Sequence, residues 1–139
     1  MTLKFSRLNP AAQAPTRKHP TDAGVDVYAS EDAWIPPFST RVIHTGVTFD
    51  VPPGTLLQVW PKSRHNYLAG AGVVDAGYQG EILIKVVNPS WKPLRVRRGQ
   101  AIAQLVHLPV LCEPLKELPA QELHREPSER GGSGGIHTG

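Results

Sequence analysis

Cysteine and long apolar runs are what this chain has least of. Cys112 is its single cysteine, which rules out an internal disulfide and a cysteine-rich zinc site. We expect Cys112 to be a small, buried or half-buried apolar side chain. No stretch approaches the roughly 18 apolar residues that a membrane helix needs, and the N-terminus has no long apolar segment. A soluble, intracellular, cytoplasmic protein without a membrane partner is expected.

Several motifs of nucleotide and hydrolase chemistry are also absent. The sequence has no GxxxxGK[ST] P-loop, no GxGxxG between a strand and a helix, and no GxSxG nucleophile turn. Its six histidines are scattered without the spacing of metal ligands. The net charge is only +3, and the basic residues are dispersed apart from Arg95, Arg97 and Arg98. This distribution disfavours a nucleic acid polymer as partner.

Glycine and proline, by contrast, are frequent. The 139 residues include 13 Gly and 14 Pro, and no 3.6-residue periodicity persists for three turns. Short strands between glycine and proline turns fit this pattern, and the length suits one domain with a core. We therefore predict an all-β fold. The expected strands lie at 3–8, 22–29, 56–60, 82–88, 94–98 and 100–111, with two more within 40–51.

The stretch at 61–81 concentrates the chemistry of the chain. A basic and hydroxyl cluster, KSR, lies at 62–64, and a carboxylate with an aromatic neighbour follows at Asp75 and Tyr78. Apolar residues on both sides predict two strands joined by a turn at 65–72. Such a hairpin brings phosphate-binding groups and a general base together.

Two polar side chains interrupt strands that are otherwise apolar. Asp26 alternates with valines, so we expect it on the opposite face, either facing solvent or forming part of a site. Gln104 lies in the middle of the last strand, and a buried amide needs partners. It therefore either bonds neighbouring backbone or points into a site. The strand at 82–88, broken only by Lys85, is expected to be buried on most of both faces.

The composition changes after Cys112. Prolines and charges replace large apolar residues from Glu113 onward, and GGSGGIHTG ends the chain. This predicts a β domain at 1–112 and a flexible C-terminal arm at 113–139. N–H groups of consecutive glycines close around phosphate oxygens, and Arg130 adds a forked cation beside them.

Five short segments, in order, resemble the motifs of the trimeric dUTP pyrophosphatases (dUTPases). They are AGVDV at 23–27, PKS at 61–63, GVVDAGYQGE at 72–81, GQAIAQL at 99–105 and RGGSGGIHTG at 130–139. One such segment would be weak evidence, whereas five in order span nearly the whole chain. On these residues the chain resembles the dUTPase family, which shares a superfamily with the dCTP deaminases.

The resemblance implies a jelly-roll-like β-barrel or sandwich, and a homotrimer whose three active sites are shared between subunits and closed by the tail. It also implies hydrolysis of dUTP to dUMP and pyrophosphate. Asp75 would be the general base for a water that attacks the α-phosphorus, with Mg²⁺, held mainly by the triphosphate, as cofactor. Asp26 matches a residue that organises the site through solvent.

The other residues implied by the resemblance bind substrate. Tyr78 would pack beneath the deoxyribose, where a flat ring leaves no room for a 2′-hydroxyl, and Gln104 would hold phosphate oxygens together with a serine and the tail arginine. The expected substrate-binding residues are Lys62, Ser63, Arg64, Gly72, Val74, Tyr78, Gln104, Arg130, Gly134, Gly135 and Ile136.

Three features depart from the family pattern. Lys62 stands where the family usually has arginine, and our hypothesis is that Arg64 supplies the forked contact that a lysine lacks. Ser63 and Asp75 are only twelve positions apart, fewer than in the loop with which the family reads the base. Ile136 replaces an aromatic residue that stacks on the base.

These departures keep other functions open. One is a dCTP or broader dNTP pyrophosphatase of the same fold, and another is a dUTPase-like nucleotide-binding or regulatory protein without turnover. Deamination is disfavoured although 74–80 also resembles the dCTP deaminases, because Lys85 occupies the position of their catalytic glutamate.

Overall fold

The structure is a computed structural model that describes residues 2–62 and 67–124. Within these residues the chain forms eleven strands and one short helix. They are β1 (Lys4–Arg7), β2 (Gly24–Tyr28), β3 (Ala33–Ile35), β4 (Thr40–His44), β5 (Val47–Asp50), β6 (Thr55–Trp60), β7 (Leu68–Ala69), β8 (Gly72–Val74), β9 (Leu83–Val87), β10 (Leu94–Val96), β11 (Ala101–Pro109) and α1 (Ala120–Leu123). The all-β prediction is confirmed.

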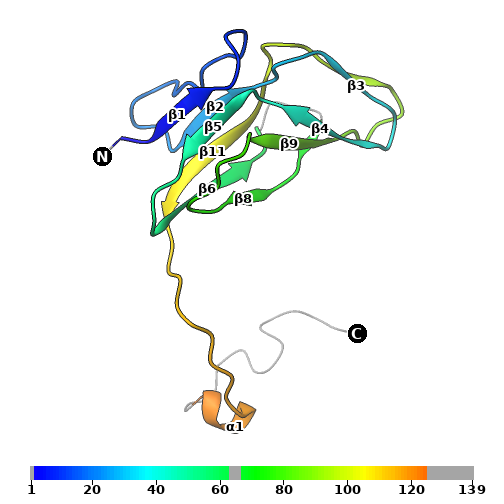
Figure 1. Ribbon diagram of the computed structural model, residues 1–139. Helices are drawn as coiled ribbons and strands as arrows, with labels where there is room; N and C mark the ends of the chain where they lie inside the picture. The colour runs from blue at the N-terminus through cyan, green and yellow to red at the C-terminus, as the bar shows by residue number, and fades with distance from the viewer. Residues whose placement is uncertain (1, 63–66, 125–139) are drawn as a thin grey trace.

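The strands pair antiparallel in four sheets (Figure 1). The largest has the order β2-β11-β6-β8, and a second has the order β4-β9-β7, while β1 pairs with β5 and β3 with β10. Most neighbours in these sheets are far apart in the chain, as expected of a jelly-roll-like fold. The nine-residue β11 lies between β2 and β6 and therefore joins the N-terminal and central parts of the chain.

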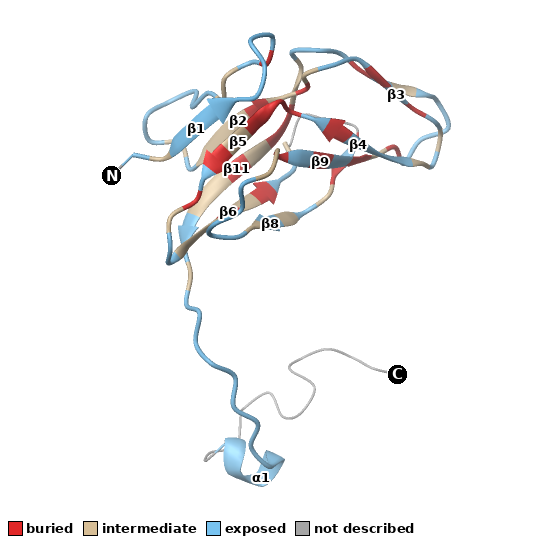
Figure 2. Cartoon of the chain, viewed as in Figure 1, coloured by how far each residue is buried: buried red, intermediate tan, exposed pale blue. Residues whose placement is uncertain are grey.

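One apolar core joins the sheets. Leu57 of β6 and Ile102 of β11 are fully buried, as are Ile43 and Ile84 of the three-stranded sheet, and all four belong to one cluster of buried side chains. Figure 2 shows the buried residues inside the strands of the β body. Tyr67, which precedes β7, is also buried, and this burial raises the pKa of its hydroxyl to about 12.

The predicted hairpin forms, but its turn is not a simple one. β6 and β8 pair with Val59 opposite Gly72. Between them, Leu68 and Ala69 were expected in a turn and instead form β7, which pairs with β9. A two-residue strand has no periodicity of its own, because its pairing is set by a partner distant in the sequence. The prediction of a turn throughout 65–72 was therefore wrong within the described residues.

The strand at 82–88 differs from its prediction as well. Burial alternates along β9, with Ile84 and Val86 buried and Leu83 and Lys85 exposed. The prediction of burial on both faces was wrong, because only one face of the β4-β9-β7 sheet contacts the core of this chain. Its outer face stays open and carries apolar side chains.

The chain leaves the β body after β11 (Figure 1). The N–H of Val110 donates to the carbonyl of Gly54, and every residue from 111 to 124 is exposed (Figure 2). Cys112 is exposed too, so the expectation of a buried or half-buried thiol was wrong. The division into a domain at 1–112 and an arm at 113–139 stays a prediction. Among the described residues, no helix is long and apolar enough to cross a membrane.

Candidate active site

Three strands of the largest sheet bring polar residues into one row. Gln104 of β11 pairs with Asp26 of β2 on one side and with Trp60 of β6 on the other. Residues directly opposite each other in antiparallel strands project to the same face, so Asp26 and Gln104 lie side by side. Lys62 follows β6 by two residues and reaches the same place. The sheet thus gathers residues that are up to 78 positions apart (26 and 104) in the sequence.

These residues line a pocket of about 260 Å³, which we call the Lys62 pocket. Nζ of Lys62 donates to Oδ1 of Asp26 at 2.6 Å, and both side chains are about four-fifths buried, at 23% and 21% exposure. Nε2 of Gln104 donates to the carbonyl of Pro61 at 3.2 Å. The predicted alternatives for Gln104 are therefore both met, since it bonds backbone and also lines a pocket.

The Lys62 pocket has a second cation that the sequence did not single out. Lys18 lines it together with Asp22, and both come from the loop before β2. This loop is held in place because Asp26 exchanges two backbone hydrogen bonds with Thr16, of 3.2 and 2.7 Å, and Oδ2 of Asp22 accepts the N–H of His19 at 3.0 Å. The carboxylates of Asp22 and Asp26 balance the two lysines, so the pocket offers ammonium and amide donors to a phosphate chain without an excess of positive charge.

A second pocket, of about 300 Å³, contains Asp75, and we call it the Asp75 pocket. Gly72, Val74, Tyr78 and Glu81 also line it. Asp75 directly follows β8 and opens a turn in which the N–H of Tyr78 donates to the carbonyl of Asp75 at 3.2 Å. Asp75 is exposed to solvent, so a water molecule can come within hydrogen-bond reach of its carboxylate.

Two glycines explain the shape of this turn. Gly77 has a φ of 83°, in the left-handed region where other residues are strained. At Gly80 a Cβ atom would lie 2.5 Å from the hydroxyl oxygen of Tyr78, so a side chain there would displace the tyrosine. The hydroxyl instead donates to the carbonyl of Glu81 at 2.8 Å, which fixes the orientation of the ring.

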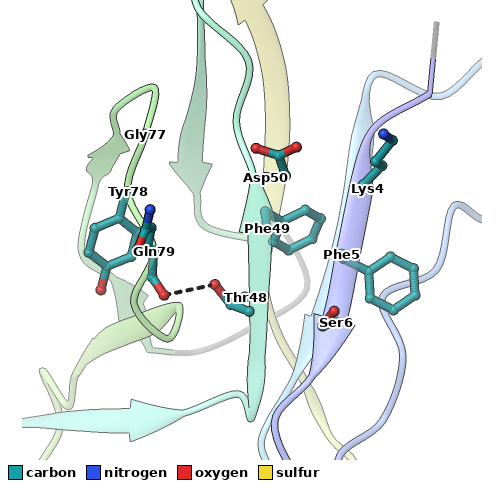
Figure 3. A pocket seen from close by; sticks show the side chains of 9 residues that line it. All are labelled: Lys4, Phe5, Ser6, Thr48, Phe49, Asp50, Gly77, Tyr78 and Gln79. Carbon is teal, nitrogen blue, oxygen red and sulfur yellow. Dashed lines mark hydrogen bonds between the residues drawn. The ribbon is translucent and has the colours of Figure 1, made fainter.

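Tyr78 also borders a third pocket, of about 280 Å³, between the turn and the N-terminal strands (Figure 3). Tyr78 and Gln79 project from one side, and Phe5 on β1 lies on the other, with Phe49 of β5 between them. The hydroxyl of Thr48 donates to the carbonyl of Gly80 at 2.8 Å and lies 3.4 Å from the carbonyl of Gln79. Tyr78 is the member of the predicted site that reaches this pocket.

The structure gathers the predicted residues into two groups rather than one. Among the described residues, no residue lines both the Lys62 and the Asp75 pocket. Val74, at the end of β8, pairs with Leu57 of β6, whereas Gln104 pairs with Trp60, three positions further along β6. Three residues of a strand span roughly 10 Å, which is the separation of the two groups along the strands. β8 is also two strands away from β11. Within one chain, Asp75 therefore does not share a pocket with Lys62 and Gln104.

Six of the predicted site residues lie outside the described residues. They are Ser63, Arg64, Arg130, Gly134, Gly135 and Ile136. Their roles, including the forked contact expected of Arg64, stay predictions. Conversely, the sequence analysis missed Lys18 and gave no role to Glu81, although Glu81 ends one of the quoted motifs.

Comparison with known proteins agrees with the motifs. The family model described as dUTPase matches residues 11–139. A deoxyuridine 5'-triphosphate nucleotidohydrolase from Gloeothece citriformis is 36% identical over 145 residues, covering 100% of this chain and 97% of the relative. The protein of the same name from Candida albicans is 35% identical, covering 99% of this chain and 88% of the relative.

Solved structures are similar over the same range. The dUTPase of Staphylococcus bacteriophage 80alpha with dUpNHpp has a TM-score of 0.83 and 27% identity, and 99% of each chain is covered. A mutant dUTPase from phage phi11 of S. aureus, whose structure concerns the coordination of a structural Mg(II) ion, has a TM-score of 0.82 and 25% identity, covering 88% of this chain and 99% of that one. With a matching family model, relatives above 30% identity and a similar fold in solved dUTPases, this chain belongs to the dUTPase family.

Proposed function

We propose that this protein is a dUTP nucleotidohydrolase, which splits dUTP into dUMP and pyrophosphate. Two pockets carry the proposal. One combines the exposed carboxylate of Asp75 with the aromatic ring of Tyr78, and the other combines cationic and amide groups. The first suits a nucleoside and the reacting water, and the second suits a phosphate chain. The names of the relatives support dUTP as the substrate.

Asp75 acts as the general base in this proposal. Its carboxylate takes a proton from a water molecule as the water oxygen attacks the α-phosphorus. The bond between the α-phosphorus and the oxygen that bridges to the β-phosphorus breaks, and the electron pair leaves with pyrophosphate. The solvent exposure of Asp75 supports this role, because the nucleophile is water.

The phosphate chain is bound in the Lys62 pocket. Lys62 and Lys18 supply positive charge, and the amide of Gln104 supplies a hydrogen-bond donor. Lysine binds phosphate as a point charge without the fixed fork of arginine. A second lysine in the pocket offsets part of that loss, and Ser63, Arg64, Arg130, Gly134 and Gly135 are proposed to complete the phosphate contacts.

The nucleoside is bound in the Asp75 pocket. Gly72 and Val74 lie on the edge strand β8, whose open backbone groups suit hydrogen bonds to a base. The Tyr78 ring lies beneath the deoxyribose and excludes a 2′-hydroxyl. Ile136 is proposed to cover the other face of the base in place of an aromatic residue, which would make stacking there weak.

Mg²⁺ fits the donors of the Lys62 pocket as a companion of the triphosphate. It prefers oxygen ligands and retains several waters, and the carboxylate of Asp26 offers those waters an acceptor beside Lys62. When bound, the ion neutralises the charge that develops on the phosphates. A related phage dUTPase has a structural Mg(II) ion, which supports the use of this metal.

A homotrimer is the proposed assembly. The separation of the Lys62 and Asp75 pockets within one chain supports active sites shared between subunits. The outer face of the β4-β9-β7 sheet exposes Val42, Leu68 and Leu83, and the arm exposes Leu111 and Leu115. Side chains of this kind are typical of surfaces that a partner covers. We also propose that the protein acts inside the cell, where deoxynucleoside triphosphates are made and used.

The test of this function is pyrophosphate release with Mg²⁺ from dUTP, dCTP, dTTP, dATP, dGTP and UTP, for the wild type and Asp75→Asn. We expect release from dUTP, and a loss of at least about 10²-fold in kcat in the variant with the affinity for dUpNHpp retained. Equal turnover by Asp75→Asn would contradict the assignment of the base. Preferred release from dCTP would favour the broader pyrophosphatase, and binding without release would favour the regulatory protein.

A further inference from the structure

A compact set of hydrogen bonds ties Glu81 to the corner between β4 and β5. Oε2 of Glu81 accepts the N–H of Gly46 at 2.9 Å, and Nδ1 of His44 lies 3.1 Å from both carboxylate oxygens. A carboxylate only accepts hydrogen bonds, so Nδ1 carries the proton in this pair. The Glu81 side chain is about three-quarters buried, at 24% exposure, whereas the His44 side chain is about half exposed, at 49%.

The corner that receives Glu81 is itself firmly held. Ser30 donates both its N–H and its hydroxyl to the carbonyl of His44, at 2.8 and 3.0 Å. The fully buried hydroxyl of Thr45 donates to the carbonyl of Ile82 at 2.6 Å. The N–H of Ile82 in turn donates to the carbonyl of Val47 at 2.9 Å. Glu81 is thus joined to one of the best-connected parts of the β body.

On its other side, Glu81 ends the turn that presents the reacting residues. Residues 75–79 are all exposed, so the turn has little packing of its own. Its internal contacts run through Tyr78, whose N–H donates to the carbonyl of Asp75 and whose hydroxyl donates to the carbonyl of Glu81. The turn has further bonds to the β body, from the N–H of Gly77 to the carbonyl of Val51 at 3.2 Å and from the hydroxyl of Thr48 to the carbonyl of Gly80 at 2.8 Å. Glu81 adds the contact nearest the ring, since a displacement of its backbone carbonyl perturbs the hydrogen bond that orients Tyr78.

We propose that Glu81 is a positioning residue of this active site, which through His44 and Gly46 fixes the turn that presents Asp75 and Tyr78. This inference rests on the proposed function, since it assigns the turn to dUTP hydrolysis. Both oxygens of the Glu81 carboxylate are engaged by His44 and Gly46, so its proposed role is to position the turn rather than to transfer a proton. It acts by holding the general base within the narrow range of positions from which it reaches the attacking water.

The experiment compares Glu81→Ala, Glu81→Gln and His44→Ala with a matched control, Glu31→Ala. Glu31 carries the same charge and is exposed in the connection between β2 and β3. For each variant we would measure kcat and KM for dUTP, the affinity for dUpNHpp, and hydrogen exchange of peptides covering residues 75–82 and Gly46. Hydrogen exchange reports on the turn whether or not the protein turns over dUTP.

For Glu81→Ala we expect kcat to fall by about 10- to 100-fold with a smaller change in dUpNHpp affinity. We expect exchange to accelerate only within 75–82 and at Gly46, whose N–H loses its acceptor. Glu81→Gln keeps an acceptor for Gly46 and is expected to recover most of kcat, while His44→Ala lies between the two. If Glu81→Ala does not fold, the same measurements on Glu81→Gln and His44→Ala test the inference. The inference is overturned if exchange at 75–82 and kcat match the Glu31→Ala control, or if exchange rises across the whole sheet.

A wild type that fails to hydrolyse dUTP would instead overturn the proposed function. In that case accelerated exchange confined to 75–82 and Gly46 still supports the anchoring of the turn by Glu81, and unchanged exchange at 75–82 refutes it. The two failures are therefore distinguishable.

Discussion

Gly24 leaves the space that the amide of Gln104 occupies. A Cβ atom at position 24 would lie 2.2 Å from Oε1 and 3.1 Å from Cδ of Gln104. The first distance is far below van der Waals contact and the second is tight, whereas the φ of Gly24 is not in the left-handed region. The backbone of β2 therefore accepts alanine, and the amide has to move out of the Lys62 pocket.

We predict that Gly24→Ala raises KM for dUTP by about 10-fold, because one charge-assisted hydrogen bond to phosphate is lost. Steady-state kinetics would measure this, and Gln104→Ala should raise KM to a similar degree. The double variant should add little to either. Gly54→Ala is the control, since a Cβ there meets no atom within 4 Å but the φ of 79° strains any side chain. It should lower the free energy of unfolding and leave KM unchanged.

The sequence predicts those site residues whose neighbours in the site are also close in the chain or on the same strand. Asp75 and Tyr78 are three positions apart and share a pocket, and the alternation that placed Asp26 opposite the valines brings it beside Gln104. Lys18 and Glu81 were missed because their roles depend on distant neighbours. Glu81 and Gly46, for example, are 35 positions apart, and no local pattern predicts that contact.

At the scale of the elements, Asn88 joins the connection between β9 and β10 to the end of β3. It is 1% exposed, and its Nδ2 donates to the carbonyls of Lys92, Ile35 and Pro36 at 2.7, 3.1 and 3.3 Å. Its Oδ1 accepts the N–H and the hydroxyl of Ser90. One amide thus satisfies the backbone of two connections.

Replacement of Asn88 by alanine removes these bonds and leaves buried carbonyls without a donor. We expect Asn88→Ala to lower the free energy of unfolding by about 2–4 kcal/mol, measured by urea denaturation. Ser90→Ala removes only hydroxyl contacts and should cost about 1 kcal/mol or less. Equal losses in the two variants would contradict the bridging role of Asn88.

Short apolar segments between glycine and proline turns predicted most strands, whereas the partner of each strand could not be predicted from such local signals. The alternation at 22–29 predicted the face on which Asp26 lies, because it depends only on the residues of that strand. β7 was missed because two residues carry no period, and it exists through its pairing with β9. The apolar run of β9 suggested two buried faces, but apolar composition does not distinguish a face covered by the same chain from one left open.

At the scale of the whole molecule, the separation of the Lys62 and Asp75 pockets predicts complementation between subunits. Asp75→Asn and Lys62→Ala should each be nearly inactive alone. After they are unfolded and refolded together in equal amounts, about a quarter of the sites in random trimers would combine an intact Asp75 with an intact Lys62 from different chains.

Activity should therefore recover to about a quarter of the wild-type value in the mixture. Each variant refolded with itself is the control, and sedimentation would establish the mass of the assembly. No recovery in a trimer would indicate sites contained within one chain, and a monomer would refute the shared-site arrangement altogether.

The distance between the two pockets also determines how mutations in this protein would be inherited. In the proposed trimer, a chain without Asp75 inactivates a site whose phosphate-binding residues come from an intact neighbouring chain. A chain with substitutions in both pockets inactivates two of the three sites, although it is only one of the three subunits. In a cell that expresses two versions of this gene, defects of this kind are therefore partly dominant, whereas a defect that prevents folding of the β body is recessive.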